Sequence, residues 1–274
     1  MDHGRNKEWR AVGKNQRKAT GEIHQMKTVK LGRRNEIQPI EWQPYVGETV
    51  IIKTVIKGGK KIQETAFYED RVKNKPQGNA YCIGNGPSRK GFDLNLLKQS
   101  GQIYGCNALY RDFKPDFLFS VDAKMSREIS ESRIWTQGVH CYAPSLEVNR
   151  NEGLVLIPHN PHYTSGNQAI HTAIIHGHKN IFMLGYDFRE YGKDQLNNIY
   201  QNTENYGERH SDAVFDAWLT TFRKTVKQRP YVNFTIVHDN PPEYLHHLQT
   251  GTDLKNTSLM TYKEFTSKVL GQNA

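Results

Sequence analysis

The chain has 274 residues, of which 36% are hydrophobic and 24% are charged, and its mean hydropathy is −0.76. This length fits one large domain or two small ones and is enough to bury a core. The low hydropathy indicates that part of the chain lies outside that core. The longest apolar runs are far shorter than the ~20 residues of a membrane-spanning helix, so we expect no membrane span.

The three cysteines, Cys82, Cys106 and Cys141, are odd in number and widely spaced. This pattern argues against a disulfide framework and favours a reducing compartment. We therefore expect a cytoplasmic protein, or a virion protein if a phage encodes the chain. The first residues contain no apolar segment of the secretory type, which agrees with that expectation.

The positive charge is concentrated at the start of the chain. Residues 1–35 contain ten Lys or Arg and three acidic residues, a difference of seven out of the net charge of +9. We assign residues 1–45 to a basic N-terminal arm. Such an arm either docks on an acidic partner surface, nucleic acid or anionic lipid, or is a disordered, solvated leader.

Two β-rich runs follow the arm, at residues 50–56 and 62–68, and the sequence Lys57-Gly58-Gly59-Lys60 separates them. Two glycines between β-branched runs are typical of a hairpin turn. We expect residues 46–75 to form a β-hairpin extension, with the main domain beginning at Pro76.

From Asn79 onward, strand and helix patterns alternate. Short continuous apolar runs, typical of strands covered on both faces, predict strands at residues 80–83, 103–106, 117–121, 140–142, 154–157, 181–184 and 231–237. Helical patterns occupy residues 94–100, 126–135, 168–177 and 212–227. The alternation predicts an α/β fold over residues 76–274, a Rossmann-like domain with a mainly parallel sheet and helices on both faces.

The first candidate site is the turn Gly84-Asn85-Gly86-Pro87-Ser88, which follows the first strand of this domain. In doubly wound sheets, the first strand ends at the ligand crevice. The glycines would let the backbone approach a phosphate, Asn85 would offer its carboxamide to a phosphate or a sugar, and Ser88 fits a helix N-cap. The turn matches neither the dinucleotide fingerprint nor the P-loop, and an ordinary strand-to-helix turn explains it as well.

Polar residues also follow other predicted strands. Asn107 comes after the second strand, where it reads a ribose or base edge or is an ordinary turn residue. Asp122 follows the third strand, and Tyr186 and Asp187 follow the strand at 181–184. Thr164-Ser165-Gly166 precede the helix at 168–177, which is typical of an anion site or of a simple N-cap.

These blocks together resemble the bacterial sialyltransferases of glycosyltransferase family 42. The blocks are residues 84–88, Cys106-Asn107, residues 164–166 and Gly185-Tyr186-Asp187-Phe188. The first block also resembles phage and bacterial proteins related to the archaeal hydroxymethylpterin pyrophosphokinases. The resemblance covers about residues 79–237 and leaves out residues 1–75.

The family resemblance implies a GT-A-like glycosyltransferase that needs no metal or cofactor and transfers a sugar from CMP-sialic acid to a glycan acceptor. It implies that Asn85, Asn107 and Ser165 contact the nucleotide-sugar. Tyr191 would hydrogen-bond the leaving phosphate, with Tyr200 and Tyr206 as further candidates, and His210 would deprotonate the acceptor, a role that suits the near-neutral pKa of histidine. The remaining substrate-binding candidates are Gly84, Gly86, Ser88, Asp122, Thr164, Gly166, Tyr186 and Asp187.

The chain also departs from the family pattern. Arg89-Lys90-Gly91 stand where relatives often have an apolar residue, and the expected acceptor lid, residues 192–208, is polar. Two other functions therefore stay open. One is a pyrophosphokinase-like transferase that uses ATP with magnesium, and the other is a phage-encoded virion-associated or accessory protein that keeps the fold without catalysis.

Overall fold

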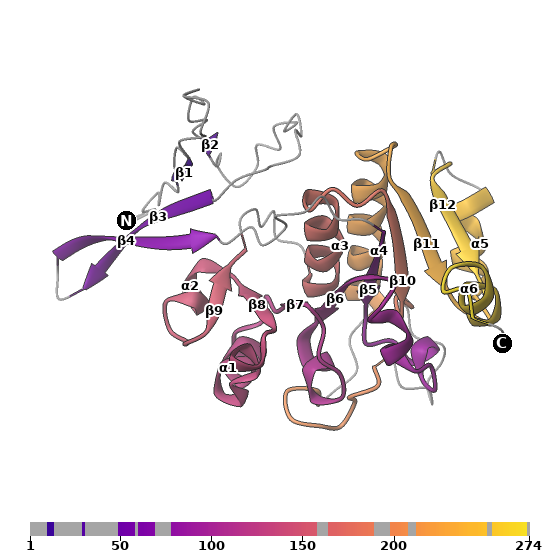
Figure 1. Cartoon of the computed structure of the whole chain (residues 1–274), viewed down its shortest axis with the longest axis horizontal. Helices are drawn as coiled ribbons and strands as arrows, with labels where there is room; N and C mark the ends of the chain where they lie inside the picture. Colours follow the sequence, from indigo (N-terminus) through magenta and orange to yellow (C-terminus); the bar gives the residue numbers. More distant parts are fainter. Residues whose placement is uncertain are drawn as a thin grey trace. The chain divides into compact units, whose positions relative to one another are not determined.

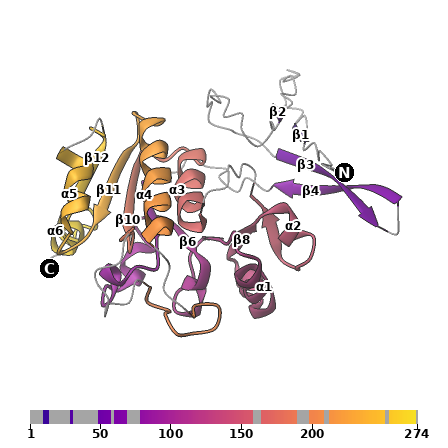
Figure 2. The same ribbon diagram turned by 180° about the vertical axis from the view of Figure 1, so that it is seen from behind.

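The computed structural model describes residues 10–13, 29–30, 49–57, 60–68, 78–157, 164–188, 198–207, 212–250 and 254–272. The chain divides into two compact units, residues 1–75 and 76–274. Figures 1 and 2 show the ribbon from opposite sides.

The first unit contains a four-stranded antiparallel sheet. Its order is β2-β1-β3-β4, and the strands are β1 (Arg10–Gly13), β2 (Val29–Lys30), β3 (Thr49–Lys57) and β4 (Lys60–Tyr68). β3 and β4 pair from Thr49 opposite Tyr68 to Lys57 opposite Lys60, which confirms the predicted hairpin and its two-residue connection. β1 and β2 fall within residues 1–45, and β1 pairs with β3, so strand pairing joins the basic arm to the hairpin.

The second unit is built on one parallel sheet of eight strands, in the order β12-β11-β10-β5-β6-β7-β8-β9. The predicted Rossmann-like α/β fold is confirmed, and all seven predicted strands are present. The eighth, β12, was not predicted, because Thr257 and Ser258 interrupt its apolar pattern. The strands are β5 (Asn79–Ile83), β6 (Gly101–Cys106), β7 (Phe117–Phe119), β8 (His140–Ala143), β9 (Leu154–Leu156), β10 (Asn180–Leu184), β11 (Asn233–Val237) and β12 (Thr257–Met260).

Six α-helices connect or follow these strands in the described part of the second unit: α1 (Ala123–Ser132), α2 (Ser145–Val148), α3 (Ser165–Ile175), α4 (Asp212–Lys227), α5 (Glu243–Thr250) and α6 (Tyr262–Lys268). α4 has its predicted bounds. The predicted helix at 94–100 is a 3-10 turn, Leu94–Leu97, and α1 ends before Arg133, whose φ of 55° breaks the predicted 126–135. Within the described ranges, no helix has the length and apolar character needed to cross a membrane.

The sheet is covered on both faces. α3 packs against β5, β6 and β7 with α4 beside it, and Figure 2 shows these two helices together. On the opposite face, Tyr81 and Ile83 belong to an apolar cluster that also contains Leu97 and Phe265 of α6. Because neighbouring residues of a strand point to opposite faces, both faces of β5 are apolar, and its apolar run is therefore continuous.

The strand order reverses between β5 and β10. From β5, the chain adds β6 to β9 on one side of the sheet, and then returns to place β10, β11 and β12 on the other side. All these strands are parallel, so their carboxyl ends lie along one edge. In open α/β sheets, ligands bind in the crevice at such a reversal point.

Candidate functional site

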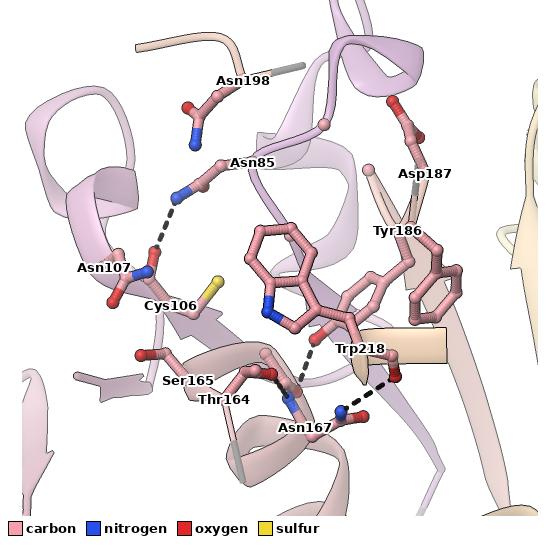
Figure 3. A pocket seen from close by; sticks show the side chains of 15 residues that line it. Asn85, Cys106, Asn107, Thr164, Ser165, Asn167, Tyr186, Asp187, Asn198 and Trp218 are labelled. Carbon is pink, nitrogen blue, oxygen red and sulfur yellow. Dashed lines mark hydrogen bonds between the residues drawn. The ribbon is translucent and has the colours of Figure 1, made fainter. Parts of the chain in front are cut away.

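A pocket opens at the carboxyl ends of β5, β6 and β10, at the point where the strand order reverses (Figure 3). The four sequence blocks, which are spread over a hundred residues of the chain, meet there, and Asn167, Asn198 and Trp218 complete the lining. Nine of the predicted substrate-binding residues line this pocket: Gly84, Asn85, Gly86, Asn107, Thr164, Ser165, Gly166, Tyr186 and Asp187.

Gly84 and Gly86 allow the turn after β5 to approach the turn after β10. The N–H of Gly84 donates to the carbonyl of Leu184 at 2.8 Å, and that of Gly86 donates to the carbonyl of Gly185 at 2.9 Å. A Cβ atom on Gly84 would lie 2.3 Å from the Gly185 oxygen. From the sequence, we expected the backbone of these glycines to approach a bound phosphate. Instead, the end of β10 lies against them, and its carbonyl groups accept their N–H groups.

Asn85 presents an oriented acceptor to the pocket. Its side chain is 8% exposed, and its Nδ2 donates to the Cys106 carbonyl at 3.2 Å, which fixes the direction of the carboxamide. Its Oδ1 is buried without a hydrogen-bond partner among the described residues. A buried acceptor left without a donor costs about 1–3 kcal/mol, so a ligand that brings an N–H or O–H group would recover that cost.

Asn107 offers a second acceptor of the same kind. Its φ is 52°, in the left-handed region that Asn tolerates better than most residues, so the predicted turn is present. Its Oδ1 is nevertheless buried without a hydrogen-bond partner in the described part of the chain. The turn conformation therefore explains the backbone of Asn107 but gives no donor to its carboxamide oxygen among the described residues.

The first turn of α3 forms the third wall. Thr164 is the N-cap, and its Oγ1 accepts the N–H of Asn167 at 3.3 Å. Ser165 is 4% exposed, and its Oγ accepts the N–H of Val121 at 3.0 Å, which ties α3 to the end of the neighbouring strand β7. The opening N–H groups of a helix and its dipole favour negative charge, so this wall suits a phosphate.

Ser88 and Asp187 bind each other across two strand ends. The N–H of Ser88 donates to Oδ2 of Asp187 at 3.0 Å, and its hydroxyl donates to Oδ1. Burial raises the pKa of Asp187, and the hydrogen bonds from Ser88 act against that rise. Ser88 does not line the pocket and its side chain caps no helix, so both of its predicted roles are replaced by this contact.

Arg89 explains one departure from the family pattern. The side chain is 6% exposed, and its Nε donates to the Gly84 carbonyl at 2.7 Å. Its Nη2 donates to the Tyr200 hydroxyl at 3.1 Å. A charged residue is therefore accommodated in a buried position because its N–H groups reach acceptors on two segments of the site.

Residues 198–207, the described part of the expected lid, are held by polar contacts. The N–H of Ile199 donates to the Asn85 carbonyl at 2.8 Å. Arg111 donates to Thr203 Oγ1 at 2.7 Å and also pairs with Glu128 of α1. The Tyr206 hydroxyl accepts Nδ2 of the pocket residue Asn85 at 3.5 Å, whereas the Tyr200 hydroxyl accepts a hydrogen bond from Arg89.

Three other predicted residues lie apart from the pocket or beyond the described ranges. Asp122 is exposed, does not line the pocket, and caps α1 by accepting the N–H groups of Lys124 and Met125 at 2.9 and 3.3 Å. Tyr191 and His210 lie outside the described residues, so their proposed roles stay predictions.

The cysteines are buried thiols in the described structure. All three cysteines are unpaired and buried, and burial raises the pKa of the pocket residue Cys106 to about 12, so it is a neutral thiol near pH 7. The described residues contain no cluster of three or more His, Cys, Asp or Glu side chains that could hold a metal ion.

Three pocket residues were not predicted from the sequence: Asn167, Trp218 and Asn198, the last of which lies within the expected lid. Asn167 directly follows a recognised block, so its position was the available signal. Trp218 lies in α4, far along the chain, and only the packing of α4 beside α3 brings it to the pocket. Comparisons of the chain with known protein families, with curated proteins and with solved structures find no match.

Proposed function

We propose that the second unit is a sialyltransferase-like glycosyltransferase, which binds a CMP-type nucleotide-sugar between β5 and β10 and transfers the sugar to an acceptor hydroxyl without a metal. One observation carries this proposal. Two buried carboxamide oxygens, on Asn85 and Asn107, find no donor among the described residues, at the reversal point of a parallel sheet and beside the start of α3. A nucleotide-sugar brings hydroxyl and amino donors together with a phosphate, which matches both kinds of wall.

The transfer of the sugar from CMP to the acceptor would proceed as follows. The bond between the sugar carbon and the phosphate oxygen breaks, its electron pair leaves with CMP, and the sugar carbon gains positive charge. The acceptor oxygen then bonds to that carbon and loses its proton to a base. The opening N–H groups of α3 would stabilise the departing phosphate, with Tyr191 as a further donor, and His210 would be the base.

The test is a binding screen with CMP, UDP, GDP and ATP, each with and without magnesium. We expect CMP to stabilise the chain without magnesium, by roughly 2.7 kcal/mol when its concentration is a hundred times the dissociation constant. Selective stabilisation by ATP with magnesium would support the pyrophosphokinase-like alternative. A lack of response to every nucleotide would favour an accessory protein without catalysis.

A variant of Asn107 links the screen to the pocket. Asn107→Gly keeps the left-handed backbone and removes the unpartnered Oδ1, so it should weaken CMP binding by about fivefold, the value of one typical hydrogen bond. Asn202→Gly is the matched control, because Asn202 also has a left-handed φ, 63°, but is exposed and outside the pocket. Equal affinities for the two variants would contradict the assignment of Asn107.

A further inference from the structure

The pocket has an aromatic side opposite its polar side. Tyr186, Phe188 and Trp218 line it, and Figure 3 shows the Trp218 indole in front of Tyr186, with Asn167 beside the Trp218 backbone. Tyr186 and Phe188 are buried, and their ring centroids lie 5.9 Å apart. The Tyr186 hydroxyl donates to the Gly166 carbonyl at 2.9 Å, which holds that ring in place. Trp218 is partly exposed, so its ring is the accessible member of this group.

Asn167 lies next to this aromatic side and is oriented by it. Its Nδ2 donates to the backbone carbonyl of Trp218 at 3.5 Å (Figure 3). Because a carbonyl accepts only a donor, this contact identifies the nitrogen and makes the other atom, Oδ1, the acceptor. The side chain is 2% exposed, and the described residues provide no partner for Oδ1.

An unpartnered carboxamide in this position is costly for the empty protein. Leucine has the same number and branching of side-chain heavy atoms and would bury no unmet acceptor. Native proteins leave few buried polar atoms without a partner, and each such atom needs an explanation. Here the unmet atom belongs to a residue that lines a pocket, next to the partly exposed Trp218, so a group bound in the pocket is the candidate for the missing donor.

We infer that Asn167 and Trp218 form a ring-binding subsite of the pocket. The subsite takes a ring with a flat or apolar face for the indole and an N–H or O–H group on its edge for Oδ1 of Asn167. The inference rests on the proposed function, in which two parts of the donor have this chemistry: an amino-bearing nucleobase and the hydroxyl-bearing sugar. Aromatic side chains stack on nucleobases, and the same surface suits the apolar face of a sugar ring.

The experiment measures the binding of CMP, CMP-sialic acid and free sialic acid by calorimetry. Asn167→Leu removes the acceptor and keeps the branching of the side chain, and Trp218→Ala removes the indole from a partly exposed position. We expect each variant to bind at least one CMP compound about tenfold more weakly than the wild-type chain. Trp218→Phe, which keeps a flat ring, should lose less affinity than Trp218→Ala.

The pattern of loss identifies the ring. Equal losses for CMP and CMP-sialic acid assign the subsite to the base, and a loss confined to CMP-sialic acid or sialic acid assigns it to the sugar. Asn233→Leu is the control, because Asn233 is exposed at the opposite end of the sheet, where its Nδ2 donates to Asn180. If both pocket variants keep wild-type affinity, the subsite is overturned and the proposed function stands. If the wild-type chain binds none of the three compounds, both are overturned.

Discussion

The polar side chains around the pocket are of two kinds. Some form hydrogen bonds with other groups of the protein, and others have an acceptor atom that a ligand could use. Arg89, Ser88 and Asp122 donate to or accept from nearby groups of the chain, whereas the Oδ1 atoms of Asn85 and Asn107 have no such partner in the described part of the chain. A polar residue after a strand fits both groups equally well, because short side chains bond readily to nearby backbone. The sequence therefore predicted which residues gather at this edge, but not which of them cap helices or brace turns.

Ser88→Ala tests the buried contact at the residue scale. The change removes the hydrogen bond from the Ser88 hydroxyl to the Asp187 carboxylate and keeps the one from the backbone N–H, and it should lower the free energy of unfolding by about 1–3 kcal/mol near pH 7. Burial already raises the pKa of Asp187, so the folded chain holds that proton at a pH where the unfolded chain has lost it. The contribution of Asp187 to the free energy of unfolding therefore decreases as the pH rises above the ordinary pKa of Asp. Without the Ser88 hydroxyl, the pKa of Asp187 in the folded chain rises further, and this decrease continues to a higher pH.

Urea unfolding at about pH 7 and about pH 4 measures this effect. The loss caused by Ser88→Ala should be larger at the higher pH, where Asp187 must carry its charge without the Ser88 hydroxyl. An equal loss at both values would show that the Asp187 charge is not involved.

At the scale of elements, buried strands were the most predictable part of the fold. β5, β6 and β10 are nearly continuous apolar runs because both faces of the sheet are covered, and such runs indicate strands without any periodicity. The bounds of the helices were predicted less accurately than the strands. α3 begins at Ser165, three residues before the predicted start, because the Thr164 cap and not the apolar pattern determines where it begins. β12 has too few apolar residues to be recognised from the sequence.

Gly84→Ala tests the contact between the β5 and β10 turns. An added Cβ would lie 2.3 Å from the Gly185 oxygen and 3.1 Å from the Tyr186 ring, so the two turns would have to separate. We expect a loss of about 1–3 kcal/mol in unfolding free energy, the usual cost of overpacking, together with weaker CMP binding. Gly207→Ala is the control, since a Cβ there meets nothing within 4 Å. If Gly84→Ala were as stable as Gly207→Ala, the close approach would not be essential.

For the whole molecule, charge and fold are divided between the two units. Residues 1–75 contain 17 of the 37 Lys and Arg residues and 9 of the 28 acidic residues, so the second unit carries a net charge near +1. The boundary at Pro76 could be predicted from the change in composition. The pairing of β1 with β3 could not, because a four-residue strand of ordinary composition leaves no recognisable pattern.

Removal of residues 1–75 tests whether the second unit is self-sufficient. Its eight-stranded sheet and apolar clusters consist of residues from 79 onward, so the shortened chain should unfold cooperatively with a Tm within about 2–4 °C of the full chain, and should bind CMP with unchanged affinity. It should also lose any salt-sensitive binding to acidic surfaces, such as heparin, because it loses most of the net positive charge. Calorimetry and heparin chromatography measure these properties on the same sample. A fall in Tm of about 10 °C or more would show that the first unit contributes to the stability of the second.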